Sequence, residues 1–242
     1  MYPEWMKVRR HRLWLAVTFA SFMTMMEIGQ NQSAIHAANN WEDQVTVPQS
    51  ALNTLIGEPD HHFHRAIDFY AQGNADGAAT EVRAAGALIR IEAGRGSAED
   101  AAKLRAVTTN LDALASNIVN GNVGSRRDLE LAFARADLAL AAHYRTMADK
   151  ALAAKDHASA GRWLKAAGDS VDEAATWTGR SPSGAQAEVW DQMHALQEKI
   201  RTSANWSYDE AKKGVGYLGA QIQYLGQQIQ NFGASGGTNR PN

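Results

Sequence analysis

DHHFHRAIDFYAQGNADGAATEVRAAGALIRIEAG, residues 60–94, carries two apolar stripes at helical spacing on either side of Gly73-Asn74. The first stripe consists of Phe63, Ala66, Ile67 and Tyr70, and the second of Ala78, Val82, Ala85, Leu88 and Ile89. Glycine and asparagine accept the left-handed backbone that often ends a helix. The stretch therefore predicts a helix, a tight turn and a second helix, with small residues where the helices touch.

A fainter copy of this stretch returns at residues 149–179, at an offset of 82 positions. The offset aligns Ala84-Ala85-Gly86 with Ala166-Ala167-Gly168, Ala66 with Ala148, Ala78 with Ala160, Val82 with Leu164, and His61 with His143. The Gly73-Asn74 turn then falls on Lys155-Asp156. These matches indicate an internal repeat. A general richness in alanine is the competing explanation.

The order of an aromatic residue, the Gly73-Asn74 turn, Ala78 and Ala85 resembles the inner part of a tetratricopeptide hairpin. That resemblance implies a concave face that would take a peptide or a partner helix. The chain departs from the family in lacking the proline that usually ends a repeat, and its copies lie much further apart than the family's period of about 34 residues. The chain is also similar in character to YfdX-type exported bacterial helical proteins, which pair helices around a Gly-Asn or Gly-Asp turn.

The rest of the chain favours an all-α fold. Of its 242 residues, 45% are hydrophobic and only five are proline, and runs of β-branched residues are scarce. Capping patterns at Ser97, Ser125 and Ser207, and a Ser181-Pro182 pair, predict the starts of further helices. We expect an antiparallel bundle of about seven helices spanning residues 59–204, with an internal boundary near 120–125.

The N-terminal region differs from this body. Residues 1–37 combine a basic start, a short apolar run and small residues before a cleavage point, which is typical of a secretory signal peptide. An uncleaved membrane anchor is the alternative, although the apolar run is shorter than the roughly 20 residues that span a bilayer. We expect residues 38–58 to form an extended leader. The sequence therefore predicts export to the periplasm or the cell exterior, and the chain contains no cysteine.

Residues 205–232 form a separate C-terminal helix with a heptad stripe, and residues 233–242 read as a disordered tail. The stripe and the glycines beside it are a candidate partner-binding surface: Val215, Leu218, Gly219, Ile222, Leu225, Gly226, Ile229 and Phe232. Glycine repeated every seven residues indicates close approach of another helix backbone. That helix could belong to the same bundle or to a second copy of the chain. An amphipathic helix lying on a membrane is the third alternative.

Histidines supply the only candidate metal ligands. His61, His62 and His64 cluster at a predicted helix start, and His143 holds the position equivalent to His61. Neutral imidazoles bind zinc, copper or nickel, so these four residues are a candidate metal site. A core histidine held by hydrogen bonds is the competing interpretation of His143.

Other polar and aromatic groups carry a weaker signal. Five acidic residues fall off the apolar stripes and predict a solvated face: Asp68, Glu81, Glu92, Glu130 and Asp137. Four tryptophans line either a ligand groove or gaps between helices: Trp163, Trp177, Trp190 and Trp206.

Neither a phosphate-binding loop nor a nucleophile elbow occurs, so we expect no enzyme activity and no cofactor. A formal net charge of −2 argues against nucleic acid as a partner. The sequence thus favours an exported, non-enzymatic helical module acting through protein–protein interaction. The alternatives are a small-molecule or metal-binding protein that uses the histidines, and a membrane-surface protein that uses the C-terminal helix.

Overall fold

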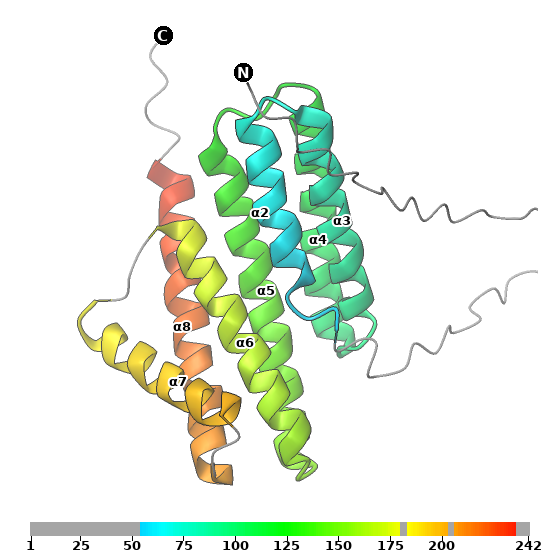
Figure 1. Ribbon diagram of the computed structural model, residues 1–242. Coiled ribbons are helices and arrows are strands. Elements are labelled where there is room, and N and C mark those ends of the chain that lie inside the picture. Colours follow the sequence, from blue (N-terminus) through cyan, green and yellow to red (C-terminus); the bar gives the residue numbers. More distant parts are fainter. Residues whose placement is uncertain (1–53, 180–182, 203–205, 236–242) are drawn as a thin grey trace, which may run out of the picture. The chain divides into compact units, whose positions relative to one another are not determined.

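A computed structural model describes residues 54–179, 183–202 and 206–235, and these residues form seven α-helices without any strand (Figure 1). The all-α prediction is therefore confirmed. The helices are α2 (Glu58–Ala71), α3 (Ala75–Ala93), α4 (Ala98–Val119), α5 (Arg126–Ala153), α6 (His157–Thr178), α7 (Ala185–Arg201) and α8 (Tyr208–Ser235). The predicted signal peptide and most of the leader lie outside the described residues, as does the tail beyond residue 235.

Helices α5 and α6 form the long central hairpin of the bundle, and α8 packs against both of them (Figure 1). Helices α2, α3 and α4 follow one another side by side, with α2 and α4 also touching α5. Helix α7 lies across α8 and contacts α6 as well. All the described residues belong to one compact unit, so α8 is part of the bundle and residues 120–125 connect α4 to α5 within it.

The α2–α3 and α5–α6 turns have the same conformation. Gly73 and Lys155 both adopt a left-handed backbone, with φ of 73° and 58°. The next residue caps the following helix in each case: the Asn74 side chain accepts a hydrogen bond from the Gly77 N–H, and that of Asp156 accepts one from the Ser159 N–H. Because these positions lie 82 residues apart, the turn geometry supports the internal repeat.

Residues 82 positions apart are also buried alike in the two hairpins. Three aligned alanine pairs are fully buried where the helices of each hairpin approach: Ala66 and Ala148, Ala78 and Ala160, Ala85 and Ala167. The glycines that follow face the next helix, because a Cβ on Gly86 would meet Leu111 of α4 and a Cβ on Gly168 would meet Gln197 of α7. The repeat therefore pairs α2, α3 and α4 with the second half of α5, α6 and α7.

Helix starts match the predicted capping patterns at three of four places. A carboxylate in the first turn accepts the N–H of the cap residue at Ser97, Ser125 and Ser207, over 3.4, 2.9 and 2.8 Å. Helix α7 is the exception, because it begins at Ala185 after Gly184, whose φ is 60°. The predicted start at Ser181-Pro182 lies outside the described residues.

Arg127 of α5 joins three helices at one end of the bundle. Its guanidinium donates to the Trp177 and Thr178 carbonyls at the end of α6, over 2.6 and 2.9 Å, and lies 4.7 Å from the Phe232 ring centroid of α8. Carbonyls in the last turn of a helix have no partner within that helix, so these bonds cap α6.

We expect Arg127→Ala to lower the free energy of unfolding by about 1–3 kcal/mol, because two charged hydrogen bonds are lost. Urea denaturation followed by circular dichroism measures this loss. Arg126→Ala is the matched control, since the exposed Arg126 side chain bonds Glu130 of its own helix, and we expect a loss below about 0.5 kcal/mol. Equal losses in the two variants would contradict the capping role.

Candidate functional site

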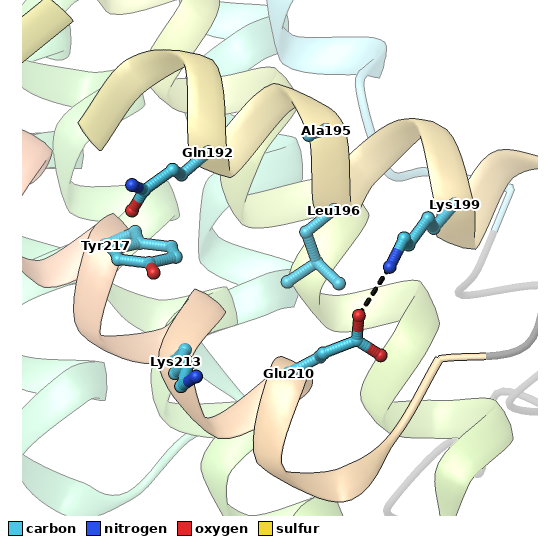
Figure 2. Close-up of a pocket in the computed structure, with 7 residues that line it drawn as sticks. All are labelled: Gln192, Ala195, Leu196, Lys199, Glu210, Lys213 and Tyr217. Atoms are coloured by element: carbon cyan, nitrogen blue, oxygen red, sulfur yellow. Dashed lines mark hydrogen bonds and ion pairs between the residues drawn. The ribbon is translucent and has the colours of Figure 1, made fainter. Parts of the chain in front are cut away.

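A surface pocket of about 200 Å³ opens between α7 and α8. Three α8 residues and four α7 residues line it: Glu210, Lys213 and Tyr217, with Gln192, Ala195, Leu196 and Lys199 (Figure 2). Figure 2 shows Gln192 and Tyr217 at one end of the pocket and Lys199 with Glu210 at the other. The nearly buried Leu196 side chain lies between the two ends. The pocket thus has an apolar floor and a polar rim.

Gly214 allows α7 to approach α8 at this point. A Cβ on Gly214 would lie only 2.2 Å from Cδ2 of Leu196 and 3.6 Å from Cδ2 of Leu164. Leu196 therefore rests directly on the α8 backbone, in space that any other residue at position 214 would fill. The depth of the pocket floor depends on this glycine.

The rim of the pocket has one positive charge in excess. Lys199 and Glu210 form an ion pair, and the hydrogen bond from Lys199 holds the pKa of Glu210 down to about 2. Glu210 also accepts the N–H of Ser207, which fixes its position at the start of α8. Within the described part of the chain, the exposed Lys213 has no ion-pair partner. An approaching anion would therefore meet Lys213.

The histidines predicted as metal ligands are not brought together. His61 is exposed, and Nδ1 of His62 lies 2.6 Å from Oε2 of Glu81 on α3. His64 is directed to α6, whereas His143 is buried against α3. Among the described residues, no group of three or more His, Asp or Glu side chains is arranged to hold a metal ion. The geometry gives the histidine site no support.

The apolar stripe of α8 faces its own bundle. Val215, Leu218, Leu225 and Ile229 are all buried in the hydrophobic core that α8 shares with α5 and α6. The stripe therefore packs on its own bundle, as one interpretation held, and the alternative of a partner-binding surface is wrong for these buried residues. The same burial covers the apolar face that a membrane-surface role would need.

The glycines of the predicted surface have separate explanations. Gly219 lies under the Arg145 guanidinium of α5, which donates to the Val215 carbonyl over 2.8 Å. A Cβ on Gly219 would lie 3.1 Å from Cζ of Arg145, so the glycine leaves room for this α5–α8 bond. Space beside Gly226 is open. Ile222 and Phe232 are partly buried.

Two acidic residues meet inside the bundle, where the sequence predicted a solvated face for one of them. Asp137 of α5 is fully buried, and its carboxyl faces that of the largely buried Asp60 of α2. Burial raises the pKa of Asp60 to about 6. Burial, followed by the charge of Asp60, raises the pKa of Asp137 well above its usual range. The expectation of a solvated Asp137 is therefore wrong.

Glu92 of α3 is the second buried carboxylate that the sequence placed at the surface. Its Oε1 accepts a hydrogen bond from Arg95 over 2.9 Å, and its Oε2 lies 3.6 Å from Nε2 of the buried His143. The Arg95 guanidinium also lies 4.6 Å from the Trp163 ring centroid, on which Tyr144 stacks. His143 is thus a core residue, as one interpretation held, but among the described residues its ring nitrogens make no hydrogen bond.

The four tryptophans fill space between helices. Trp163 and Trp177 are 3% and 5% exposed, and Trp190 and Trp206 pack partly buried against the core. A ring atom of Trp206 would lie 3.2 Å from a Cβ on Gly161, so the small residue receives the indole. The groove interpretation has no support from these positions.

The pocket residues were not singled out by sequence reasoning. Lys213 and Tyr217 lie together on one face of α8 beside its apolar stripe, and a cationic residue four positions before an aromatic one was the available signal. Comparison with protein-family models, curated proteins and solved structures finds no match. Within the described residues, no helix is long and apolar enough to cross a membrane.

Proposed function

We propose that the chain is an exported, non-enzymatic binding module that holds a protein partner at the pocket between α7 and α8. The partner segment carries an apolar side chain next to an acidic one. The apolar side chain enters over Leu196 and Tyr217, and the acidic one pairs with Lys213. The observation that carries this proposal is the combination of an apolar floor with Lys213 on the rim, which has no ion-pair partner in the part of the chain that the structure describes. The basic and apolar N-terminal segment supports export.

The size of the pocket favours a side chain over a whole small molecule. Sites for small molecules usually enclose about 300–1,000 Å³, whereas this pocket measures about 200 Å³. A single leucine or aromatic side chain fits a space of that size. Energetically important anchors at protein interfaces occupy such pockets near the centre of the contact.

The charge of the rim sets the expected specificity. Because Glu210 is already paired with Lys199, the net charge available to a partner comes from Lys213. Complementary charge next to an apolar anchor speeds association and excludes segments of the wrong sign. A basic peptide would be repelled at the same place.

We expect short random peptides selected on the full-length protein to be enriched in acidic residues adjacent to a large apolar residue. Lys213→Glu should weaken binding of a selected peptide at least tenfold, a loss of about 1.4 kcal/mol, and Ala195→Trp should abolish it by filling the pocket. Isothermal titration calorimetry measures both effects.

Lys212→Glu is the matched control, because the exposed Lys212 precedes Lys213 but does not line the pocket. It makes the same charge change and should leave binding within about twofold of the wild type, which is less than about 0.5 kcal/mol. Equal weakening by the two lysine variants would show that only overall charge matters. Selected peptides without an acidic residue would overturn the proposal.

A further inference from the structure

The most unusual polar group in the bundle is the carboxyl of Asp137. It is fully buried, and neither of its oxygens has a hydrogen-bond partner of good geometry among the described residues. Oδ1 of Asp60 is also buried and also lacks a hydrogen-bond partner among the described residues. An ionised carboxylate left without donors in the protein interior is very unfavourable, and such a group takes up a proton instead.

The neighbours of the pair include a third acidic side chain. Besides Asp60, the charged group with the strongest effect on Asp137 is Glu173 of α6. The indole N–H of Trp177 points near Asp137 without good hydrogen-bond geometry. The buried Tyr144 hydroxyl of α5 also responds to the charges of both aspartates. Among the described residues, the groups that most affect the pKa of Asp137 include no arginine or lysine.

The groups that connect the pair to solvent lie on α2 and α6. His64 of α2 lies 3.1 Å from Glu173, and its ring centroid is 4.5 Å from that of Trp177. The side chains of His64 and Glu173 are 50% and 33% exposed. His61 and His64 in their charged forms favour ionisation of Asp60, whereas Glu173 opposes it. Asp60 itself is only partly buried, so this edge of the pair lies close to solvent.

We propose that Asp60 and Asp137 form a proton-binding site in which the O–H of one carboxyl donates to an oxygen of the other, fastening α2 to the central α5–α6 hairpin. Two carboxyl groups that share a site in this way cannot both ionise without strong repulsion. Loss of the shared proton places two negative charges together in the core. The docking of α2 is consequently strongest in acid and weakens as the solution becomes alkaline.

The sign of the pH dependence follows from linkage. An unfolded aspartate ionises near pH 4, whereas the pKa of folded Asp60 is raised to about 6 and that of Asp137 further. The folded chain therefore binds more protons than the unfolded chain above about pH 4. The stability that the pair contributes is complete below that pH and is lost as the pH rises through the folded values.

Infrared spectroscopy of the folded protein tests the shared proton directly. At pH 7 we expect the carbonyl band of a protonated carboxyl group, which ionised carboxylates lack. Asp137→Asn should remove this band, and Asp149→Asn, a change at an exposed position of the same helix, should keep it. Absence of the band in the wild type at pH 7 would overturn the proposal, whatever the stability of the variants.

Urea unfolding as a function of pH tests the consequence. The unfolding equilibrium constant of the wild type should rise by up to about tenfold per pH unit for each proton released, between pH 5 and pH 8. In Asp137→Asn the number of protons released on unfolding, given by the slope of this rise, should be smaller by about one. Asp149→Asn should follow the wild type. Hydrogen exchange should show α2 losing protection first as the pH rises. Parallel pH profiles for the wild type and Asp137→Asn would contradict the proposal.

Discussion

Phe133→Ala is expected to lower the free energy of unfolding by about 3–5 kcal/mol, the range for removal of a fully buried aromatic side chain. Phe133 of α5 is fully buried, and its ring stacks on Phe63 of α2 at 4.3 Å between centroids. Its ring also meets Trp177 of α6 edge to face at 5.6 Å. The substitution would open a cavity where three helices meet, and the surrounding rings could fill it only in part.

Guanidinium denaturation followed by tryptophan fluorescence measures this loss. Phe69→Ala is the control, since Phe69 of α2 is only partly buried and should lose roughly half as much. The Phe63→Ala/Phe133→Ala double variant should lose less than the sum of the two single variants, by about 0.5–1.5 kcal/mol, because the rings contact each other. Strict additivity would show that the stacked pair is not formed in solution.

Phe63 illustrates which parts of the fold the sequence could predict. Its helical spacing with Ala66, Ile67 and Tyr70 identified α2 and its buried face, and Gly73-Asn74 identified the turn. These signals are local, because apolar periodicity and turn chemistry act within a few residues. Six of the seven helix starts were found in this way. Helix α7 begins later than predicted because Gly184, rather than Ser181, precedes its first turn.

Partners across the bundle were not predictable in the same way. Glu92 lies off the apolar stripe of α3, which is ordinarily the solvated side. It is buried because His143 of α5 packs against that side of α3 and Arg95 donates a hydrogen bond to the Glu92 carboxylate. Asp137 is buried for a related reason, since α2 places Asp60 opposite it. Such long-range pairings are set by tertiary packing, which leaves no periodic trace in either helix.

The α8 stripe shows how a correct pattern can support a wrong role. The heptad spacing correctly predicted a helix that packs through Leu218, Leu225 and Ile229, but it left open whether the partner was another molecule or, as the structure shows, the chain's own α5–α6 hairpin. The candidate site arose elsewhere, where Gly214 brings α7 onto α8 and leaves Lys213 at the rim. A pocket between two helices depends on their crossing, which the sequence of neither helix specifies.

Glu92→Ala is expected to destabilise the protein by about 3–5 kcal/mol, as much as the loss of the Phe133 ring, because it breaks a buried ion pair. The Glu92 and Arg95 side chains are only 2% and 8% exposed. Without Glu92 the Arg95 guanidinium would keep its contact with Trp163 but lose its ion pair with a side chain that is itself almost fully buried. We expect the cost to arise mainly from breaking an ion pair whose charges are both shielded from water, rather than from the lost hydrogen bond alone.

This origin of the cost can be tested by removing both charges. Glu92→Leu/Arg95→Met should recover most of the stability lost in Glu92→Ala, since apolar residues of similar volume avoid the desolvation of both ions. Glu99→Ala, which breaks the exposed Glu99–Lys103 pair of α4, should cost within about 0.5 kcal/mol. Thermal and urea denaturation of the three variants measure these differences. A double variant no more stable than Glu92→Ala would mean that the pair stabilises the bundle by its hydrogen bonds and geometry, and that the buried charge is not what makes its disruption costly.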